Sequence, residues 1–215
     1  MIILVTAAAL LAPSDTMAAV RSPEQAASVP IEDYVLYDMV VNAKFLTSQT
    51  TLVLLERMTT TQLHPDQLSA PTVSWFHAQD WFDGRLPHEL IRDFVAKNQY
   101  PSRLDAHFAF GVRYRFVSGE GRPETEAALL ALPVARLVQE LEGELDTIDR
   151  LAFSRIGMTV RGDQALLYVA NPRRDESGAG FLLWLVRRQA GWDLYDTEVI
   201  WVAQPNGPPP GRPRR

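Results

Sequence analysis

The chain has 215 residues, of which 47% are hydrophobic and 22% charged, and its formal net charge is -5. This composition is typical of a folded globular protein and excludes disorder of the whole chain, and an acidic balance without a basic stripe argues against a nucleic-acid partner. The chain has no cysteine, which excludes disulfides, thiolate metal sites and cysteine nucleophiles.

The first segment has the pattern of a secretory leader. Residues 2–12 form an apolar run, shorter than the about 20 residues that cross a bilayer as a helix, and the small residues Ala18 and Ala19 follow. We therefore expect a signal peptide over residues 1–19, although no Lys or Arg precedes the apolar run. A buried amino-terminal strand and an uncleaved anchor are the alternatives. The leader predicts a periplasmic or secreted protein with no stable membrane insertion after its removal.

The composition of the remaining chain predicts three segments: a linker, a folded domain and a tail. We expect residues 20–29 to be a linker and residues 30–203 to form a single α+β domain. Residues 204–215 are dense in proline, glycine and arginine and poor in apolar residues, so they cannot form a packed core. They are predicted to be a disordered tail.

The first half of the domain mixes helices with extended segments. Apolar residues at helical spacing predict a helix over residues 30–46. Residues 51–61 are rich in β-branched side chains and predict a strand, although residues 54–58 could extend a helix. Prolines and a glycine punctuate residues 65–87, which are expected to be irregular.

A second amphipathic helix and a strand complete this half. Residues 86–99 carry their apolar side chains on one helical face. Residues 104–117 alternate between apolar and polar side chains, which is the clearest strand pattern in the chain. Residues 123–132 and 134–144 then favour helix, with Pro133 between them.

The last part of the chain changes to strands. Three apolar runs, residues 164–170, 180–187 and 192–202, are joined by short connections, which favour antiparallel neighbours. Helices come mainly first and strands last, which is the α+β pattern. We therefore predict amino-terminal helices packed on a mainly antiparallel sheet that ends in a three-stranded meander.

Four different short motifs follow one another along these strands and form one block: Ser154-Arg155-Ile156-Gly157, Gln164-Ala165-Leu166-Leu167-Tyr168-Val169, Gly178-Ala179-Gly180 and Gly191-Trp192. The block resembles the carboxyl-terminal part of uncharacterised exported bacterial proteins. This resemblance implies an exported α+β domain and transfers no activity. Many such proteins carry cysteines in the loop before the glycine pair, where this chain has none. Helices followed by an antiparallel sheet also give a weaker analogy to the NTF2-like fold.

Two histidines are the candidates for catalysis. His88 lies near the start of the second helix beside Glu89, and His107 lies near Asp105. Either could act as a general base if it were paired and desolvated, whereas a surface or structural role is the alternative for each. Ser154 lacks the Gly-x-Ser-x-Gly surroundings of a serine nucleophile.

Metal and cofactor motifs are not evident. His77, Asp80 and Asp83 offer ligand atoms within a short stretch, but their spacing matches no established metal signature. The acidic residues between 140 and 149 lack the glycine placement of a calcium loop. The glycine pair before residue 181 lacks the third glycine and the helix of a dinucleotide loop. The sequence therefore predicts no metal and no cofactor.

Two other groups could bind a ligand. Trp184, Trp192 and Tyr195 could line a concave sheet surface for an apolar or carbohydrate-like ligand, with core packing as the alternative. Arg113 and Arg115 could face an anion together with the arginine at 155, with local ion pairs as the alternative.

The function expected from these patterns is a binding or interaction domain of the bacterial envelope. Its partner would be an envelope protein or a small ligand held between the helices and the sheet. The alternative is a small enzyme of lyase or isomerase type that uses a histidine base in a pocket.

Overall fold

The structure is a computed structural model that describes residues 26–117, 147–173, 177–189 and 191–204. The predicted leader, the helices predicted over residues 123–132 and 134–144, and the tail beyond Gln204 lie outside the described residues. The end of the predicted linker packs on the domain. Val29 is only 4% exposed, and its backbone N–H donates to the carbonyl of Arg103 at 2.9 Å.

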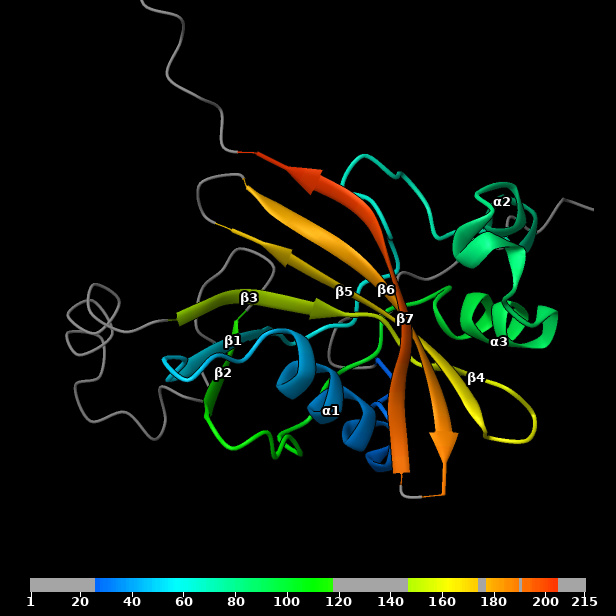
Figure 1. Cartoon of the computed structure of the whole chain (residues 1–215). Coiled ribbons are helices and arrows are strands. Elements are labelled where there is room, and N and C mark those ends of the chain that lie inside the picture. Colours follow the sequence, from blue (N-terminus) through cyan, green and yellow to red (C-terminus); the bar gives the residue numbers. More distant parts are fainter. Residues whose placement is uncertain (1–25, 118–146, 174–176, 190, 205–215) are drawn as a thin grey trace, which may run out of the picture.

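A mixed sheet of seven strands forms the centre of the described structure (Figure 1). The strands are β1 (Leu52–Glu56), β2 (Arg113–Val117), β3 (Thr147–Phe153), β4 (Gly157–Met158), β5 (Gln164–Pro172), β6 (Gly178–Arg188) and β7 (Gly191–Ala203). They lie in the order β2-β1-β3-β5-β6-β7, and β4 also pairs with β5. β1 is parallel to β2 and to β3, and the other pairs are antiparallel. The mainly antiparallel sheet is thus confirmed, with a parallel part that the sequence did not predict.

The carboxyl-terminal meander of β5, β6 and β7 is also confirmed. β6 runs antiparallel to β7 along its whole length and to β5 from Gly178 to Val186. β7 carries one extra residue at two places, Tyr195 and Ile200, where the register against β6 shifts. Such bulges bend a strand and increase its twist, and β7 is visibly curved along the outer edge of the sheet (Figure 1).

The strand predicted over residues 104–117 is wrong for its first part, because only Arg113–Val117 pairs as a strand. The preceding residues follow an irregular path, and Gly111 has a φ of 84°. Phe108 and Phe110 are still buried, and the ring of Phe108 stacks on that of Phe153 with centroids 6.0 Å apart. The alternation of apolar residues therefore reflects side chains that enter the core from a loop rather than ladder pairing.

One face of the sheet is covered by α1 (Tyr34–Lys44), which a 3-10 turn over residues 31–33 precedes (Figure 1). This confirms the first helix predicted from the sequence. Its buried residues Tyr37, Val40 and Val41 join a core that includes Leu167 and Leu183 of the meander. The helix is therefore held by the apolar stripe that its sequence period predicts.

The opposite face is covered by α3 (His88–Lys97), the second predicted helix (Figure 1). Its residues Leu90 and Phe94 join a second core with Leu166 and Tyr168 of β5. Neighbouring residues of β5 thus point into opposite cores, as the pleat of a strand requires. This explains why the run is apolar without interruption, since both faces of the strand are buried.

The segment predicted to be irregular contains two short elements. α2 (Val73–Ala78) is capped by Thr72, whose hydroxyl accepts the N–H of Trp75 at 3.2 Å. A 3-10 turn over residues 81–84 follows, and it contains residues with positive φ. The prolines correctly indicated breaks, but the N-cap at Thr72 was the signal for the short helix between them.

Candidate functional site

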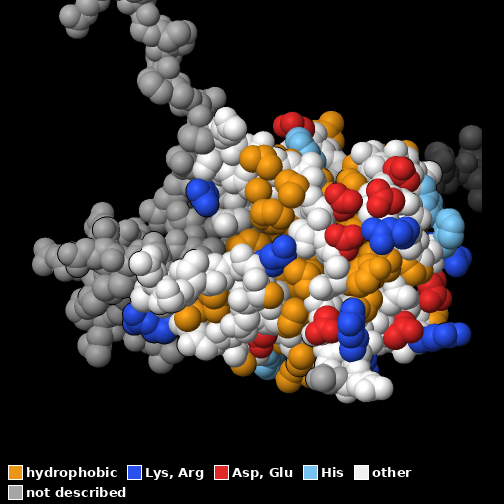
Figure 2. All heavy atoms as spheres, in the orientation of Figure 1, with side chains coloured by type: hydrophobic (Ala, Val, Ile, Leu, Met, Phe, Trp, Pro, Cys, Tyr) orange, Lys and Arg blue, Asp and Glu red, His pale blue; other side chains and the backbone are white. Residues whose placement is uncertain are grey.

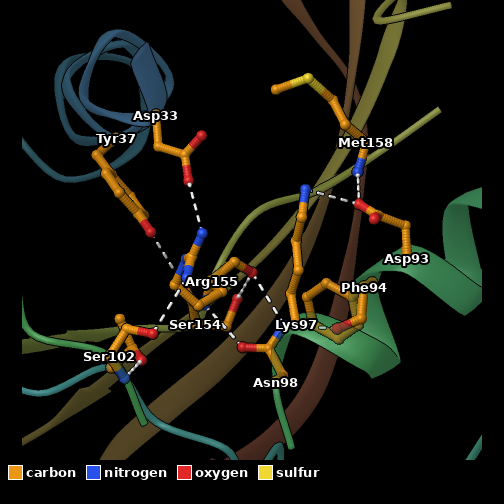
Figure 3. Close-up of polar contacts among 11 residues, drawn as sticks. Asp33, Tyr37, Asp93, Phe94, Lys97, Asn98, Ser102, Ser154, Arg155 and Met158 are labelled. Atoms are coloured by element: carbon orange, nitrogen blue, oxygen red, sulfur yellow. Dashed lines mark hydrogen bonds and ion pairs between the residues drawn. The ribbon is translucent and has the colours of Figure 1, made fainter. Parts of the chain in front are cut away.

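A group of buried polar side chains surrounds Arg155, between the start of α1 and the end of α3 (Figure 3). Arg155 Nη2 lies 3.7 Å from Asp33 Oδ2, and its Nη1 donates to Ser102 Oγ at 3.1 Å. Asn98 holds the same residue by its backbone, since Asn98 Oδ1 accepts the N–H of Arg155 at 2.7 Å and Asn98 Nδ2 donates to its carbonyl at 3.0 Å. We call these four residues and Ser154 the Arg155 cluster.

Ser154 replaces regular strand pairing where β3 ends. Its N–H donates to the carbonyl of Tyr168, and its Oγ accepts the N–H of Tyr168, both at 2.9 Å. The same hydroxyl donates to the carbonyl of Arg155 at 2.9 Å, and Tyr37 Oη donates to the carbonyl of Ser154 at 2.9 Å. The hydroxyl is therefore committed to the backbone and is not presented as a nucleophile.

The ion pair of the cluster is nearly buried. The side chains of Arg155 and Asp33 are 13% and 10% exposed. Burial raises the pKa of the Asp33 carboxyl above its ordinary 3.8, and the nearby guanidinium of Arg155 partly offsets this. Within the described part of the chain, Asp33 Oδ2 and Arg155 Nε have no hydrogen-bond partner. The pair therefore attracts through charge alone and carries a desolvation penalty.

The arrangement favours a structural role for the cluster. Asp33 precedes α1 on one face of the sheet, and Asn98 ends α3 on the other, so Arg155 connects the helices of both faces. A site that binds an anion or moves a proton would leave one of these groups facing open space. Here the guanidinium and the carboxylate face each other (Figure 3).

Residues of the carboxyl-terminal block are also held by contacts within the fold. Gln164 Oε1 accepts the indole N–H of Trp184 at 3.0 Å, and Tyr168 Oη accepts the indole N–H of Trp201 at 2.7 Å. Burial raises the pKa of Tyr168 to about 12. A Cβ at Gly180 would lie 2.1 Å from Trp201 Nε1, so a residue with a side chain here would clash with the indole.

Both candidate histidines lie on the surface. The ring of His107 packs edge-on against Tyr34, with centroids 5.1 Å apart. His88 Nδ1 lies 3.1 Å from Nε2 of His77, so its partner is another histidine. Asp83, which the sequence placed beside His77, pairs with Arg85 at 3.5 Å. Neither candidate base has the desolvated setting that would tune it for proton transfer.

The three candidate arginines have different surroundings. Arg113 is exposed and Arg115 is half-buried on β2, and strand alternation places both on one face. Arg155 instead binds Asp33 and Ser102 inside the cluster. Arg155 therefore forms an ion pair within the fold, which was the stated alternative to facing an anion together with Arg113 and Arg115.

The aromatic residues of the terminal strands do not share one surface. Trp184 is 7% exposed and belongs to the core beneath α3, whereas Trp192 packs against the core beneath α1. Tyr195 is 48% exposed, and its ring lies edge-on to Trp184 with centroids 4.7 Å apart. Trp184 and Trp192 therefore pack against different cores, and Tyr195 is the most exposed of the three residues.

The outer edge of β7 is a surface that the sequence reasoning missed. β7 ends the strand order, and in the described part of the chain it pairs with β6 alone. Val199 and Val202 are 54% and 65% exposed. The signal was available, because the last strand of a meander has a neighbour on one side only unless another segment covers it.

Comparisons with known proteins give no match to a protein-family model, a curated protein or a solved structure. The resemblance to uncharacterised exported bacterial proteins and the analogy to the NTF2-like fold therefore stay predictions.

Proposed function

We propose that the chain is an exported binding domain of the bacterial envelope that takes an extended segment of a partner protein at the open edge of β7. Export and the envelope rest on the leader-like residues 1–19 of the sequence. No helix in the described ranges has the length and apolar character needed to cross a membrane. The binding mode rests on the surface of β7.

The observation that carries the proposal is a strand edge that no other described residue pairs with, and that has apolar side chains beside it. β7 extends over 13 residues. A strand at a sheet edge offers a row of backbone donors and acceptors to an added strand, and neighbouring side chains supply specificity. Val199 pairs with Phe181, and Val202 with Ala179, so both valines lie on the face that α1 covers elsewhere. Their exposure gives an added strand apolar contacts.

The two halves of β7 differ in charge. In the first half, Asp193 pairs with Arg188 at 3.2 Å, and Asp196 pairs with Arg85 at 3.2 Å. Charged side chains of this kind protect an edge from pairing. In the second half, the one acidic residue, Glu198, accepts the N–H of Phe82 at 2.9 Å. Residues 199–203 carry no charge, so this half is the better docking site.

Charge also favours a partner over a second copy of the chain. The net charge of -5 opposes self-association. Figure 2 shows hydrophobic side chains gathered over the second half of β7, with both basic and acidic side chains around them. A partner segment that alternates apolar residues with basic residues would match the apolar surface and the net negative charge of the chain.

The test is selection of peptides from a random display library by the full-length protein. Peptides of about ten residues are long enough to add one strand. We expect the selected peptides to alternate apolar and basic residues. Their affinity should fall at least about tenfold for the variant Val199→Lys/Val202→Lys. The matched control is Val160→Lys, because Val160 is 91% exposed in the turn after β4.

Equal binding of the selected peptides by both variants would place the site elsewhere and overturn the proposal. Sedimentation velocity of the unliganded protein tests whether a second copy of the chain occupies the edge of β7 instead. A dimer that Val199→Lys/Val202→Lys dissociates, and Val160→Lys does not, would assign the edge to a second copy and would also overturn the proposal.

A further inference from the structure

His77 and His88 come from different helices and meet at the surface. His77 lies in the last turn of α2, and His88 is the first residue of α3. Nε2 of His77 and Nδ1 of His88 are 3.1 Å apart, and the ring centroids are 4.6 Å apart. The chain has four histidines, and these two bring one nitrogen each to the same point. We call them the histidine pair.

The nitrogen separation fits two ligands of one metal ion. Imidazole nitrogens bind Zn²⁺ at about 2.0–2.1 Å, so two ligands at a tetrahedral angle are about 3.3 Å apart and two at a right angle about 2.9 Å apart. The observed 3.1 Å lies between these values. Without a metal, one ring donates a proton to the lone pair of the other. A metal ion would accept a lone pair from each ring, and the proton of the donating nitrogen would move to the other nitrogen of the same ring, so that both imidazoles stay neutral.

The backbone beneath the histidine pair is well anchored. Phe76, the neighbour of His77, is 2% exposed and packs on Phe94 of α3 with ring centroids 5.7 Å apart. Leu90, in the first turn after His88, is fully buried. The two helices are thus held together by their apolar sides, which leaves the exposed rings facing each other without further rearrangement. Such pre-organisation lowers the entropy lost on binding.

We propose that His77 and His88 form a binding site for a borderline divalent transition-metal ion, of the Zn²⁺, Ni²⁺ and Cu²⁺ class. Imidazole is a preferred ligand of these ions, whereas Mg²⁺ and Ca²⁺ prefer oxygen. Among the described residues, no group of three or more histidines and carboxylates is arranged to hold a metal. Water therefore completes the coordination sphere, and the site is an open, exchangeable one.

The pattern was not visible in the sequence because it crosses between helices. The two residues are 11 apart, and the sequence reasoning instead grouped His77 with Asp80 and Asp83. Familiar metal signatures place two ligands on one helix or one loop. Here the packing of α2 on α3 supplies the spacing.

The test is titration of the full-length protein with Zn²⁺, followed by NMR of the histidine imidazole signals and by calorimetry. We expect the signals of His77 and His88 to shift together, while those of His64 and His107 respond less. His77→Gln and His88→Gln should each weaken Zn²⁺ binding at least about tenfold, since even the loss of a partner that only supports a ligand costs about 10–100-fold. His64→Gln and His107→Gln are the matched controls.

A second measurement does not depend on assigned signals. Zn²⁺ bound across α2 and α3 should raise the thermal unfolding midpoint of the wild-type protein, because the paired rings bind the ion more tightly than the separated histidines of the unfolded chain do. The rise should vanish in His77→Gln and persist in His64→Gln. Equal Zn²⁺ affinity of the wild type and both pair variants, or a thermal shift that all variants share, would overturn the proposal.

Discussion

Arg155→Met tests whether the charge of Arg155 stabilises the packing of α1 and α3 on the two faces of the sheet. Methionine keeps much of the length of the arginine stem but removes the guanidinium. The substitution leaves the Asp33 carboxyl, whose side chain is 10% exposed, without its cation. It also removes the 3.1 Å hydrogen bond to Ser102.

The structure sets a ceiling on the loss from the stranded carboxylate. A buried carboxylate without a cation escapes its desolvation by taking up a proton. From the ordinary pKa of 3.8, protonation at pH 7 costs about 4 kcal/mol, since each pH unit corresponds to about 1.4 kcal/mol. Removal of the guanidinium relieves its own desolvation, whereas loss of the Ser102 hydrogen bond adds about 1 kcal/mol. We expect the free energy of unfolding to fall by about 3 kcal/mol at pH 7.

The sign of the pH dependence follows from the pKa of Asp33. Burial already raises this pKa in the wild type, and Arg155 partly offsets the rise. Without the arginine, the folded-state pKa rises further above 3.8. The folded protein then holds a proton that the unfolded chain releases, so stability falls as the pH rises above about 4. The loss relative to the wild type should therefore be small near pH 4 and large at pH 7.

The assay is urea unfolding of the full-length protein, followed by tryptophan fluorescence and far-UV circular dichroism. The wild type, Arg155→Met, Asp33→Asn and the double variant are compared at about pH 4.5 and pH 7. The double variant has no carboxyl at this position, so its loss should not grow with pH. A loss in Arg155→Met that is equal at both pH values, or single losses that simply add in the double variant, would refute this reasoning.

Two further substitutions test contacts of the carboxyl-terminal block, each by urea unfolding. Tyr168→Phe leaves the indole N–H of Trp201 without its acceptor and should cost about 1 kcal/mol at pH 7. Because the pKa of Tyr168 is raised from 10.0 to about 12, the wild type should lose stability between these pH values relative to Tyr168→Phe, and an unchanged difference would contradict this. Gly157→Ala places a Cβ 2.5 Å from Cβ of Phe94 and 2.6 Å from its Cα, so α3 must shift, at a cost of about 3 kcal/mol. The control is Gly162→Ala, where no atom lies within 4 Å of the new Cβ but a φ of 65° brings a backbone strain of about 1–2 kcal/mol. A loss in Gly157→Ala no larger than this would show that crowding is not the cause.

The sequence predicted best where burial alone decides the structure. The two amphipathic helices and the three strands of the meander carry their apolar residues at the period of the element that they form. The same reasoning failed for residues 104–112, because side chains can alternate between core and solvent along a loop. Whether a segment joins a ladder depends on a neighbouring strand. Of residues 104–117, only residues 113–117 pair with β1, and nothing local in the sequence specifies that.

The candidate sites show the same division. The positions of Trp184 and Trp192 follow from strand alternation only when their register is known, and their separation into two cores came from the pairing of β6 with β7. The contact of His77 with His88 depends on how α2 packs on α3. The ion pair of Asp33 with Arg155 joins residues far apart in the sequence. Contacts between elements decide all three, and a single sequence contains no direct record of them.

The residues that made the carboxyl-terminal block conspicuous are engaged in holding the fold together. The Ser154 hydroxyl accepts a backbone N–H of β5, and Gln164 accepts the indole N–H of Trp184. Gly180 leaves space for the indole of Trp201. A side chain that is buried and fully partnered in this way is a poor candidate for recognising anything outside the protein. A motif of this kind therefore identifies an architecture, and function must be sought on surfaces outside it. The histidine pair lies outside the block altogether. The valines at 199 and 202 lie on its last strand, but neither belongs to its motifs.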